Sequence, residues 1–344
     1  MNQSRDEASV PQRWVRPFDI PPGSLKLQMP DKILALGARG ELPALRALLK
    51  AHPDYLSKRG NHGRTLLWEA ARRGKLPAVK WLLARGAEID ITGCYNNESL
   101  LQLTPYVAAR YYRRAAVAEF LWAAGARLDV FRAAFLGEQA RVEAALAAEP
   151  ALLRAEDPLD NTYYAPLLAF AVAGGQAALA DWLVRQGAPV AEYSAQLFQF
   201  AGRTGRMDLV RWLLANGADA RATESGIFQA VADLDILRLL LEHGASPTRA
   251  GANGFTPLVY VTRADKAERP ETAALLLEWG AAVDEVGPRG RTALHGAASG
   301  GHAQVIKLLL AHGARTDVRD DAGATPLDLA RAGGKTAAAR LLRG

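Results

Sequence analysis

Apolar residues recur along the chain in short clusters spaced three and four apart, which predicts a series of short amphipathic helices. The clearest example begins at residues 292–298, passes through Gly301 and continues with the apolar run at 305–310. Glycine directly after an apolar segment can adopt the left-handed conformation that ends a helix. This stretch therefore predicts two short helices joined by a tight turn.

The end of the second helix has the same design at seven places in the chain. An apolar triplet, two further residues and then Gly-Ala occur at residues 81–87, 120–126, 182–188, 212–218, 239–245, 275–281 and 308–314. A unit of about 33 residues with a turn and two short helices cannot bury its apolar face alone. The copies are therefore expected to stack and to share one continuous core.

The start of the first helix varies more than the end of the second. Residues 256–258 and 325–327 are Thr-Pro-Leu, residues 104–106 and 165–167 vary this opening, and residues 65–67 lack the proline. Threonine can cap free backbone N–H groups, and proline fits the first helical turn, where its missing donor is not needed. These openings resemble the ankyrin repeat family, whose signature is Thr-Pro-Leu-His-x-Ala.

The resemblance covers about nine tenths of the chain, although the signature histidine stands only at His295. It implies an all-α fold: an elongated, curved, ankyrin-type repeat solenoid of paired antiparallel helices with hairpin-like turns. We expect one ankyrin repeat domain over residues 31–344, with nine or ten repeats, the last of them a C-terminal cap. Residues 1–30 are expected to form a flexible N-terminal tail, although their apolar side chains leave open that they cover the first repeat.

Two weak units, residues 33–56 and 131–153, lack the Gly-Ala ending. In each, the second helix meets a proline and then a further apolar group, at residues 55–56 and 152–153. Because the residue before proline disfavours the helical region, this pattern predicts an extended connector.

Three stretches break the repeat period. The loop at 94–103 is longer than a standard hairpin tip and is expected to project from the hairpin side. The connection over 265–270 gains about three residues, and the unit around 230–233 is about two residues short. Insertions in solenoids map to loops, where partners often differ, but neutral drift in a tolerant loop is an equally good explanation.

The composition fits a soluble repeat protein, with 49% hydrophobic and 23% charged residues. No apolar run approaches the roughly 20 residues that a membrane span requires, and residues 1–30 have no apolar core of signal-peptide length. A single cysteine, Cys94, excludes an internal disulfide framework and a zinc-thiolate cluster. We therefore expect a cytoplasmic protein. The Ala- and Arg-rich composition suggests a bacterial source. The alternative to a cytoplasmic location is therefore delivery to a host cell by a specialised secretion system.

Catalysis finds little support, and no catalytic, cofactor-binding or metal-binding residue is assigned. Residues 334–336 are Gly-Lys-Thr, like the end of a phosphate-binding loop, but Leu329 stands where that motif needs glycine. They are expected to connect two helices.

The histidines and acidic pairs are expected to have structural roles. No histidine pair has the His-Glu-x-x-His spacing of a metal site. His295 and His302 are expected to hydrogen-bond neighbouring turns, and His243 and His312 to lie at helix ends. Aspartates in turns, such as those at 157, 160, 233, 235, 320 and 321, are expected to accept backbone hydrogen bonds.

The resemblance implies that hairpin tips and first helices form a concave groove that holds a protein partner. Mapped by repeat position, the groove carries basic and aromatic residues: Arg64, Arg72, Arg73, Tyr111, Tyr112, Tyr163, Tyr164, Arg203, Arg263 and Arg291. Arginine and tyrosine often anchor interfaces. The resulting hypothesis is a monomeric, non-catalytic protein–protein interaction module that binds a protein or an acidic peptide.

Three alternatives stay open. The arginines could serve only to keep the surface soluble. The net charge of +6 permits nucleic-acid binding, but 36 acidic residues dilute it, and neither a helix-turn-helix nor an RNA-binding signature is present. A third hypothesis is that the 94–103 loop blocks the active site of an enzyme.

Overall fold

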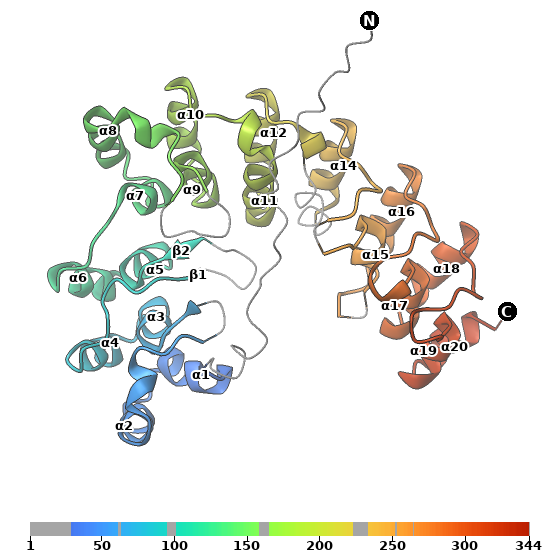
Figure 1. Ribbon diagram of the computed structural model, residues 1–344, viewed down its shortest axis with the longest axis horizontal. Helices are drawn as coiled ribbons and strands as arrows, with labels where there is room; N and C mark the ends of the chain where they lie inside the picture. The colour runs from blue at the N-terminus through green and yellow to red at the C-terminus, as the bar shows by residue number, and fades with distance from the viewer. Residues whose placement is uncertain are drawn as a thin grey trace, which may run out of the picture. The chain divides into compact units, whose positions relative to one another are not determined.

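The computed structural model describes residues 29–60, 63–94, 101–157, 165–222, 233–251, 253–263 and 265–343. Helix pairs follow one another along the chain (Figure 1) and form two compact units, one of Leu27–Ala245 and one that includes Ser246–Gly344. Residues 1–28, nearly all of the predicted tail, lie outside the described residues. Met29, which follows them, is buried and donates its N–H to the Arg59 carbonyl.

The first unit contains successive helix pairs: α1 (Asp31–Arg39) with α2 (Leu42–Ala51), α3 (Leu66–Arg72) with α4 (Leu76–Leu83), α5 (Pro105–Tyr111) with α6 (Ala115–Ala123), α7 (Val130–Leu136) with α8 (Gln139–Ala148), α9 (Leu167–Ala173) with α10 (Ala177–Arg185), and α11 (Ser194–Thr204) with α12 (Met207–Ala215). Between the pairs lie the 3₁₀ helices η3 (Pro53–Leu56), η5 (Pro150–Leu153), η6 (Ala191–Tyr193) and η7 (Ala220–Ala222), and the strands β1 (Gly93–Cys94) and β2 (Gln102–Leu103). The last helix of this unit is α14 (Leu234–Glu242). Residues 223–232, which include most of the predicted short unit, lie outside the described residues.

The second unit repeats the same design. Its elements are α15 (Pro257–Val261), α16 (Pro270–Glu278), η8 (Pro288–Gly290), α17 (Ala293–Gly300), α18 (Ala303–Ala311), α19 (Pro326–Ala332) and α20 (Thr336–Leu341). The predicted fold class, an all-α repeat of paired helices with hairpin-like turns, is therefore confirmed.

Threonine hydroxyls begin the first helices, as the sequence predicts. Thr65, Thr104 and Thr256 each accept the backbone N–H of the third residue that follows. At α19, Thr325 and Asp328 cap each other's backbone N–H groups reciprocally. Each such cap stabilises its helix by about 0.5–2 kcal/mol relative to alanine.

Small side chains allow the first helices of successive repeats to pack directly on one another. The first helices α1 and α3, α3 and α5, α7 and α9, and α17 and α19 are in contact. Ala70, Ala108 and Ala109 lie in these first helices and have no solvent exposure. Leucines from the second helices, such as Leu82 and Leu309, are also fully buried. Burial of one such leucine contributes about 1.5–3 kcal/mol.

The predicted extended connectors after the two weak units are wrong. Residues Pro53–Leu56 and Pro150–Leu153 form the 3₁₀ helices η3 and η5. Proline stands at the start of both, where its fixed φ favours a helical turn and its missing N–H leaves no unpaired donor. The extended residue is the one before each proline: His52 has φ −138° and ψ 75°, and Glu149 has φ −140° and ψ 85°.

The hairpin-like turns before the first helices come in two sizes. In the short turns, the N–H of one residue donates to the carbonyl four residues later, as in Gly60 to Arg64 and Asp320 to Ala324. In the longer turns, the two residues that pair at the base of the turn are further apart in the sequence. Residues 95–100 and 158–164, at the tips of these turns, lie outside the described residues.

Both longer turns have a hydrogen-bonded base. Strands β1 and β2 pair antiparallel, with Gly93 opposite Leu103. In the second long turn, the Asp157 N–H donates to the Ala165 carbonyl at 3.0 Å. The predicted long loop at 94–103 thus begins from a paired base, and its projection from the hairpin side stays a prediction.

The predicted longer connection between α15 and α16 caps the next repeat. Glu268 lies in this connection, and its Oε1 accepts the N–H groups of Gln304 and Val305 at 2.6 and 3.1 Å. These N–H groups belong to the first turn of α18, where backbone donors have no partner within the helix. The added residues therefore stabilise a neighbouring helix. No helix in the described ranges is both long enough and apolar enough to cross a membrane.

Candidate partner-binding surface

Two predicted surface arginines flank Trp68 and share one carboxylate. Arg64 Nη1 donates to Glu69 Oε1 at 3.3 Å, and Arg72 Nη2 donates to Glu69 Oε2 at 2.7 Å. The guanidinium carbons of Arg64 and Arg72 lie 4.9 and 5.8 Å from the centroid of the Trp68 ring. Arg64 is only 7% exposed and Glu69 only 4%. A buried charge needs a partner, so the pairing of Arg64 with Glu69 serves mainly the internal packing of the protein.

Arg72 extends the cluster to the aromatic residues at the end of α5. Its guanidinium carbon lies 5.6 Å from the Tyr112 ring, and Tyr112 meets Tyr111 edge-on at 5.1 Å. Tyr111 also lies 5.0 Å from Phe135 of α7, yet 37% of Tyr111 is exposed. Burial, together with the neighbouring Tyr112 phenol, raises the pKa of the Tyr111 hydroxyl. The hydroxyl therefore stays protonated near neutral pH, on a ring held in place by its neighbours.

The turns that follow α3 and α5 add exposed cations. Arg73 directly follows α3, and Arg113 and Arg114 follow α5; all three are exposed. Arg114 Nε donates to the Arg72 carbonyl at 3.1 Å, which ties the two turns together. Arg113 has φ 57° and takes the left-handed conformation that Gly74, with φ 71°, takes in the preceding repeat. A side chain in that conformation is strained. We refer to Arg72, Arg73, Tyr111, Tyr112 and Arg113 as the α3–α5 patch.

Arg263 and Arg291 lie in the second unit, and each is paired with an aspartate. Arg263 binds both carboxylate oxygens of Asp265 at 2.8 Å, and its guanidinium carbon lies 4.9 Å from the Phe255 ring. Burial alone would raise the pKa of Asp265, but the hydrogen bonds and charge of Arg263, a backbone hydrogen bond and the charge of Lys266 together lower that pKa. Arg291 Nε donates to Asp320 Oδ2 at 3.1 Å.

Asp320 also accepts the N–H groups of Ala322 and Ala324 at 3.0 Å, the turn role that the sequence predicts for it. Burial opposes these contacts, but together with Arg291 they lower the pKa of Asp320. Arg291 therefore helps to hold a turn in place.

Three other predicted residues have no described side chain. Arg203 lies in α11, but its side chain is not among the described ones. Tyr163 and Tyr164 lie outside the described residues. The structure thus brings together Arg64, Arg72, Tyr111 and Tyr112, with Arg73 in the adjoining turn.

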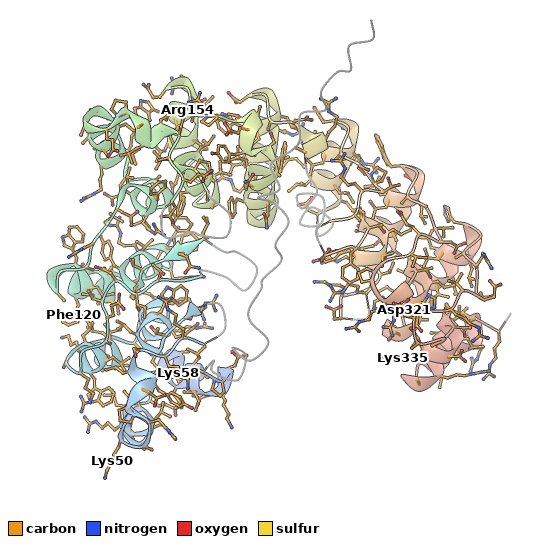
Figure 2. All side chains as sticks on the ribbon, in the orientation of Figure 1. Lys50, Lys58, Phe120, Arg154, Asp321 and Lys335 are labelled. Carbon is orange, nitrogen blue, oxygen red and sulfur yellow. The ribbon has the colours of Figure 1, made fainter. Side chains whose placement is uncertain are left out.

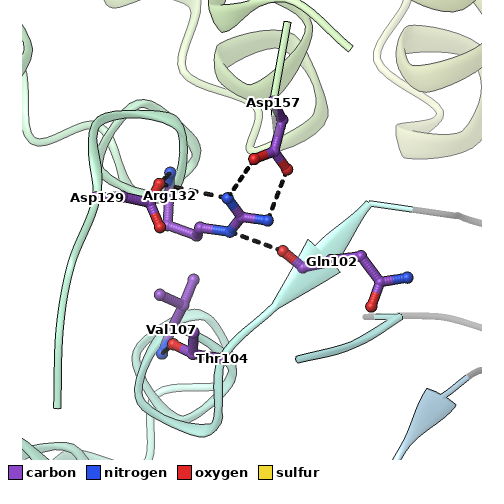
Figure 3. Close-up of polar contacts among 6 residues, drawn as sticks. All are labelled: Gln102, Thr104, Val107, Asp129, Arg132 and Asp157. Atoms are coloured by element: carbon purple, nitrogen blue, oxygen red, sulfur yellow. Dashed lines mark hydrogen bonds and ion pairs between the residues drawn. The ribbon is translucent and has the colours of Figure 1, made fainter. Parts of the chain in front are cut away.

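A buried arginine that the sequence analysis missed joins the bases of the two long turns (Figure 3). Arg132, 1% exposed, donates from Nη1 and Nη2 to the two carboxylate oxygens of Asp157 at 2.8 and 2.6 Å. Its Nε donates to the Gln102 carbonyl in β2 at 2.9 Å. Asp129 accepts the Arg132 backbone N–H at 2.9 Å and so caps α7. One guanidinium therefore links β2, at the base of the first long turn, to Asp157, at the base of the second.

The position of Arg132 in its repeat could have revealed this role. Arg132 is the third residue after the cap of its helix, and His295 and Trp68 hold the same place in theirs. Trp68 Nε1 donates to the Leu103 carbonyl at 2.8 Å, and His295 Nε2 lies 3.2 Å from the Ala324 carbonyl. Trp68 and His295 thus reach the residue just before the next repeat's cap, whereas Arg132 reaches Asp157 at the base of the next turn. A polar side chain at this place therefore signals a contact between repeats.

His295, His243 and His312 behave as predicted. His295 bonds to Thr292 of its own turn and Ala324 of the next, and His243 and His312 bond carbonyls at the ends of their helices. The Nδ1 of buried His302 has no hydrogen-bond partner among the described residues. Within those residues, no group of three His, Cys, Asp or Glu side chains could hold a metal ion.

Comparison with protein families agrees with the repeated helix pairs. The ankyrin repeat model matches residues 62–94, which include α3 and α4, and the model for three ankyrin repeat copies matches residues 269–344, which include α16 to α20. No curated protein matches the chain. Ankyrin repeats are in general protein–protein interaction modules. From these two matches and the helix pairs that carry them, the chain is an ankyrin repeat protein.

Proposed function

We propose that this protein is a non-catalytic interaction module whose α3–α5 patch binds an acidic segment of a protein partner. The observation that carries the proposal is the exposed ring of Tyr111, packed beside Tyr112, whose ring lies 5.6 Å from the guanidinium carbon of Arg72. Arg73, the next residue along the chain, is exposed as well. Aromatic rings held in place lose little side-chain entropy on binding, so they suit the centre of an interface.

The charges of the patch favour an acidic ligand. Arg73 and Arg113 are exposed, and neither forms an ion pair with another described residue. Arg72 has one carboxylate partner, Glu69, which it shares with Arg64. A partner carboxylate could therefore bind Arg73 or Arg113 without displacing an internal contact. Charge-assisted hydrogen bonds of this kind are roughly twice as strong as neutral ones.

The other predicted arginines contribute less to this proposal. Arg64 is buried against Trp68 and Glu69, so its role is to position Trp68 and Glu69 rather than to touch a ligand. Arg263 and Arg291 are each neutralised by an aspartate. A ligand carboxylate would have to compete with Asp265 or Asp320 for these two side chains.

The test combines a selection of peptides with substitutions in the patch. A displayed peptide library is selected on the full chain, and affinities of the selected peptides are measured by isothermal titration calorimetry. We expect the peptides to be rich in Asp and Glu. The variant Arg72→Gln, Arg73→Glu, Arg113→Glu is expected to weaken their binding by at least about tenfold, since each lost charged contact contributes about 1.5–3 kcal/mol. Arg72 is neutralised rather than reversed because a glutamate beside Glu69 would itself destabilise α3.

A matched control separates the patch from the overall charge. Arg154, Arg211 and Arg238 are exposed in the same unit but lie outside the α3–α5 patch, and their triple exchange to Glu changes the net charge by a comparable amount. This control should bind the peptides with less than about twofold loss. Peptides without acidic enrichment, or equal loss of binding in both variants, would refute the proposal.

A further inference from the structure

A hollow of about 350 Å³ lies at α19 and α20 in the second unit. The four charged side chains around it are all cationic: Arg331, Lys335, Arg340 and Arg343. Lys335, labelled in Figure 2, stands in the turn between the two helices. Thr336 adds a hydroxyl group, and the buried Ala330 and Ala339 line the same hollow.

Within the described part of the chain, these four cations have no close acidic partner, unlike several other arginines of the protein. Arg132, Arg263, Arg291 and Arg315 each lie within 3.4 Å of a carboxylate oxygen. None of the four around the hollow forms an ion pair or a side-chain hydrogen bond with another described residue. The carboxylate of Asp328 attracts Arg331 electrostatically, but it is already hydrogen-bonded to Thr325. Exposed cations around one hollow repel one another, and this repulsion favours a bound anion.

The preceding repeat shows that this charge is not required by the fold. Counted from the capping threonines Thr292 and Thr325, the places of Arg331 and Arg343 are taken by Ala298 and Leu310. Lys307 takes the place of Arg340, and His302 takes that of Lys335. Helices α17 and α18 thus form with a single lysine at these four places, so the further cations are available for another role.

We propose that this hollow binds a phosphate-type oxoanion. Guanidinium groups match the oxygens of such an anion in pairs, and the lysine ammonium adds a mobile point charge. The Gly334-Lys335-Thr336 sequence, which lacks the glycine and strand of a nucleotide-binding loop, places the lysine and the threonine hydroxyl together at the hollow. A multiply charged anion gains more from four cations than a carboxylate does. This site is separate from the α3–α5 patch and does not depend on the proposed function.

Titration of the full, ¹⁵N-labelled chain with inorganic pyrophosphate tests the site, at a fixed ionic strength of about 0.15 M that screens weak surface attraction. Saturable amide shifts are expected over residues 330–343, and acetate at the same ionic strength should not reproduce them. The variant Arg340→Gln, Arg343→Gln should raise the Kd for pyrophosphate at least about tenfold, whereas Lys307→Gln, Arg315→Gln, with the same loss of charge, should change it less than about twofold. Thermal melting of both variants checks that the fold is kept.

The source of the anion is distinguished by two further titrations. A phosphoserine peptide that binds more tightly than pyrophosphate, and more tightly than its unphosphorylated form, would identify a modified protein as the source. Tighter binding of pyrophosphate would identify a free anion. Shifts spread over many arginines without saturation, or an equal loss in both variants, would overturn the proposal.

Discussion

At the scale of single residues, His295 shows how one side chain can join two repeats and respond to pH. The Thr292 N–H donates to Nδ1 of His295, and Nε2 lies next to the Ala324 carbonyl. A neutral ring protonated on Nε2 satisfies both contacts, whereas a proton on Nδ1 would break the first. Burial lowers the pKa of His295, and this outweighs the neighbouring groups that would raise it. The neutral form is therefore part of the folded structure.

This lowered pKa predicts a loss of stability in mild acid. Below the unfolded-state pKa of about 6.5, the unfolded chain binds a proton that the folded chain resists, so the free energy of unfolding falls as pH falls. The loss is at most about 1.4 kcal/mol per pH unit and ends below the folded pKa. The His295→Gln variant keeps a Thr-x-x-Gln capping box, but glutamine cannot titrate. The free energy of unfolding of this variant should therefore fall less between pH 7 and pH 5 than that of the unsubstituted protein. Urea unfolding at both pH values measures the difference, and parallel pH profiles would contradict the assignment.

At the scale of secondary-structure elements, Arg132 is the joint between two long turns. It bonds Gln102 in β2 and Asp157, whose own N–H closes the second turn on Ala165. Both ionic side chains are at most 1% exposed. A buried ion pair of this kind adds little net stability, but loss of one partner leaves an uncompensated buried charge.

A double-mutant cycle tests this joint. Arg132→Met and Asp157→Leu alone should each lower the free energy of unfolding by about 3–5 kcal/mol, because each leaves a buried ion unpaired. The double variant should lose less than the sum of the two, and less than either alone if the apolar side chains pack well. Chemical denaturation of the four proteins gives the coupling energy. Additive losses would mean that the two side chains act independently.

The sequence predicts helix pairs well because their causes are local. The capping threonines and the Gly-Ala endings are visible within a few residues. The threonines cap their helices as predicted, and the glycines of the seven Gly-Ala endings all have positive φ. The connectors η3 and η5 were predicted wrongly because the rule for the residue before proline was applied to the whole segment. Arg132 was missed because its partners, Gln102 and Asp157, are 30 and 25 residues away. Arg72, Arg73, Tyr111 and Tyr112 were predicted from their repeat positions, but only the structure shows that Arg64 is buried and that Arg64 and Arg72 share Glu69.

At the scale of the whole molecule, each repeat is stabilised mainly by its neighbours along the chain. In the described residues, α7 packs against α9, and α17 packs against α19. The hydrogen-bond partners of Arg132, Gln102 and Asp157, lie in the same unit as Arg132, Leu27–Ala245. Helices α17 to α20 lie in the unit that includes Ser246–Gly344. Destabilisation at Arg132 should therefore stay local rather than weaken every repeat.

Hydrogen exchange measured by mass spectrometry on the full-length Arg132→Met variant tests this locality. Loss of the guanidinium should speed exchange at the Leu103 and Asp157 amides and in α5, α7 and α9, which adjoin the two long turns. Exchange in α17 to α20 should match that of the unsubstituted protein within about twofold, because these helices belong to the other unit and repeat stability is transmitted between neighbours along the chain. The control is Asp129→Ala, which removes the cap of α7 and a 3.4 Å contact with Arg132 Nη1 but keeps the bonds from Arg132 to Gln102 and Asp157. Loss of the cap costs about 1 kcal/mol, and it should loosen α7 without opening β1 and β2. Faster exchange throughout both units would show that the repeats unfold as one cooperative block, and exchange confined to α7 would show that Arg132 does not couple the two turns.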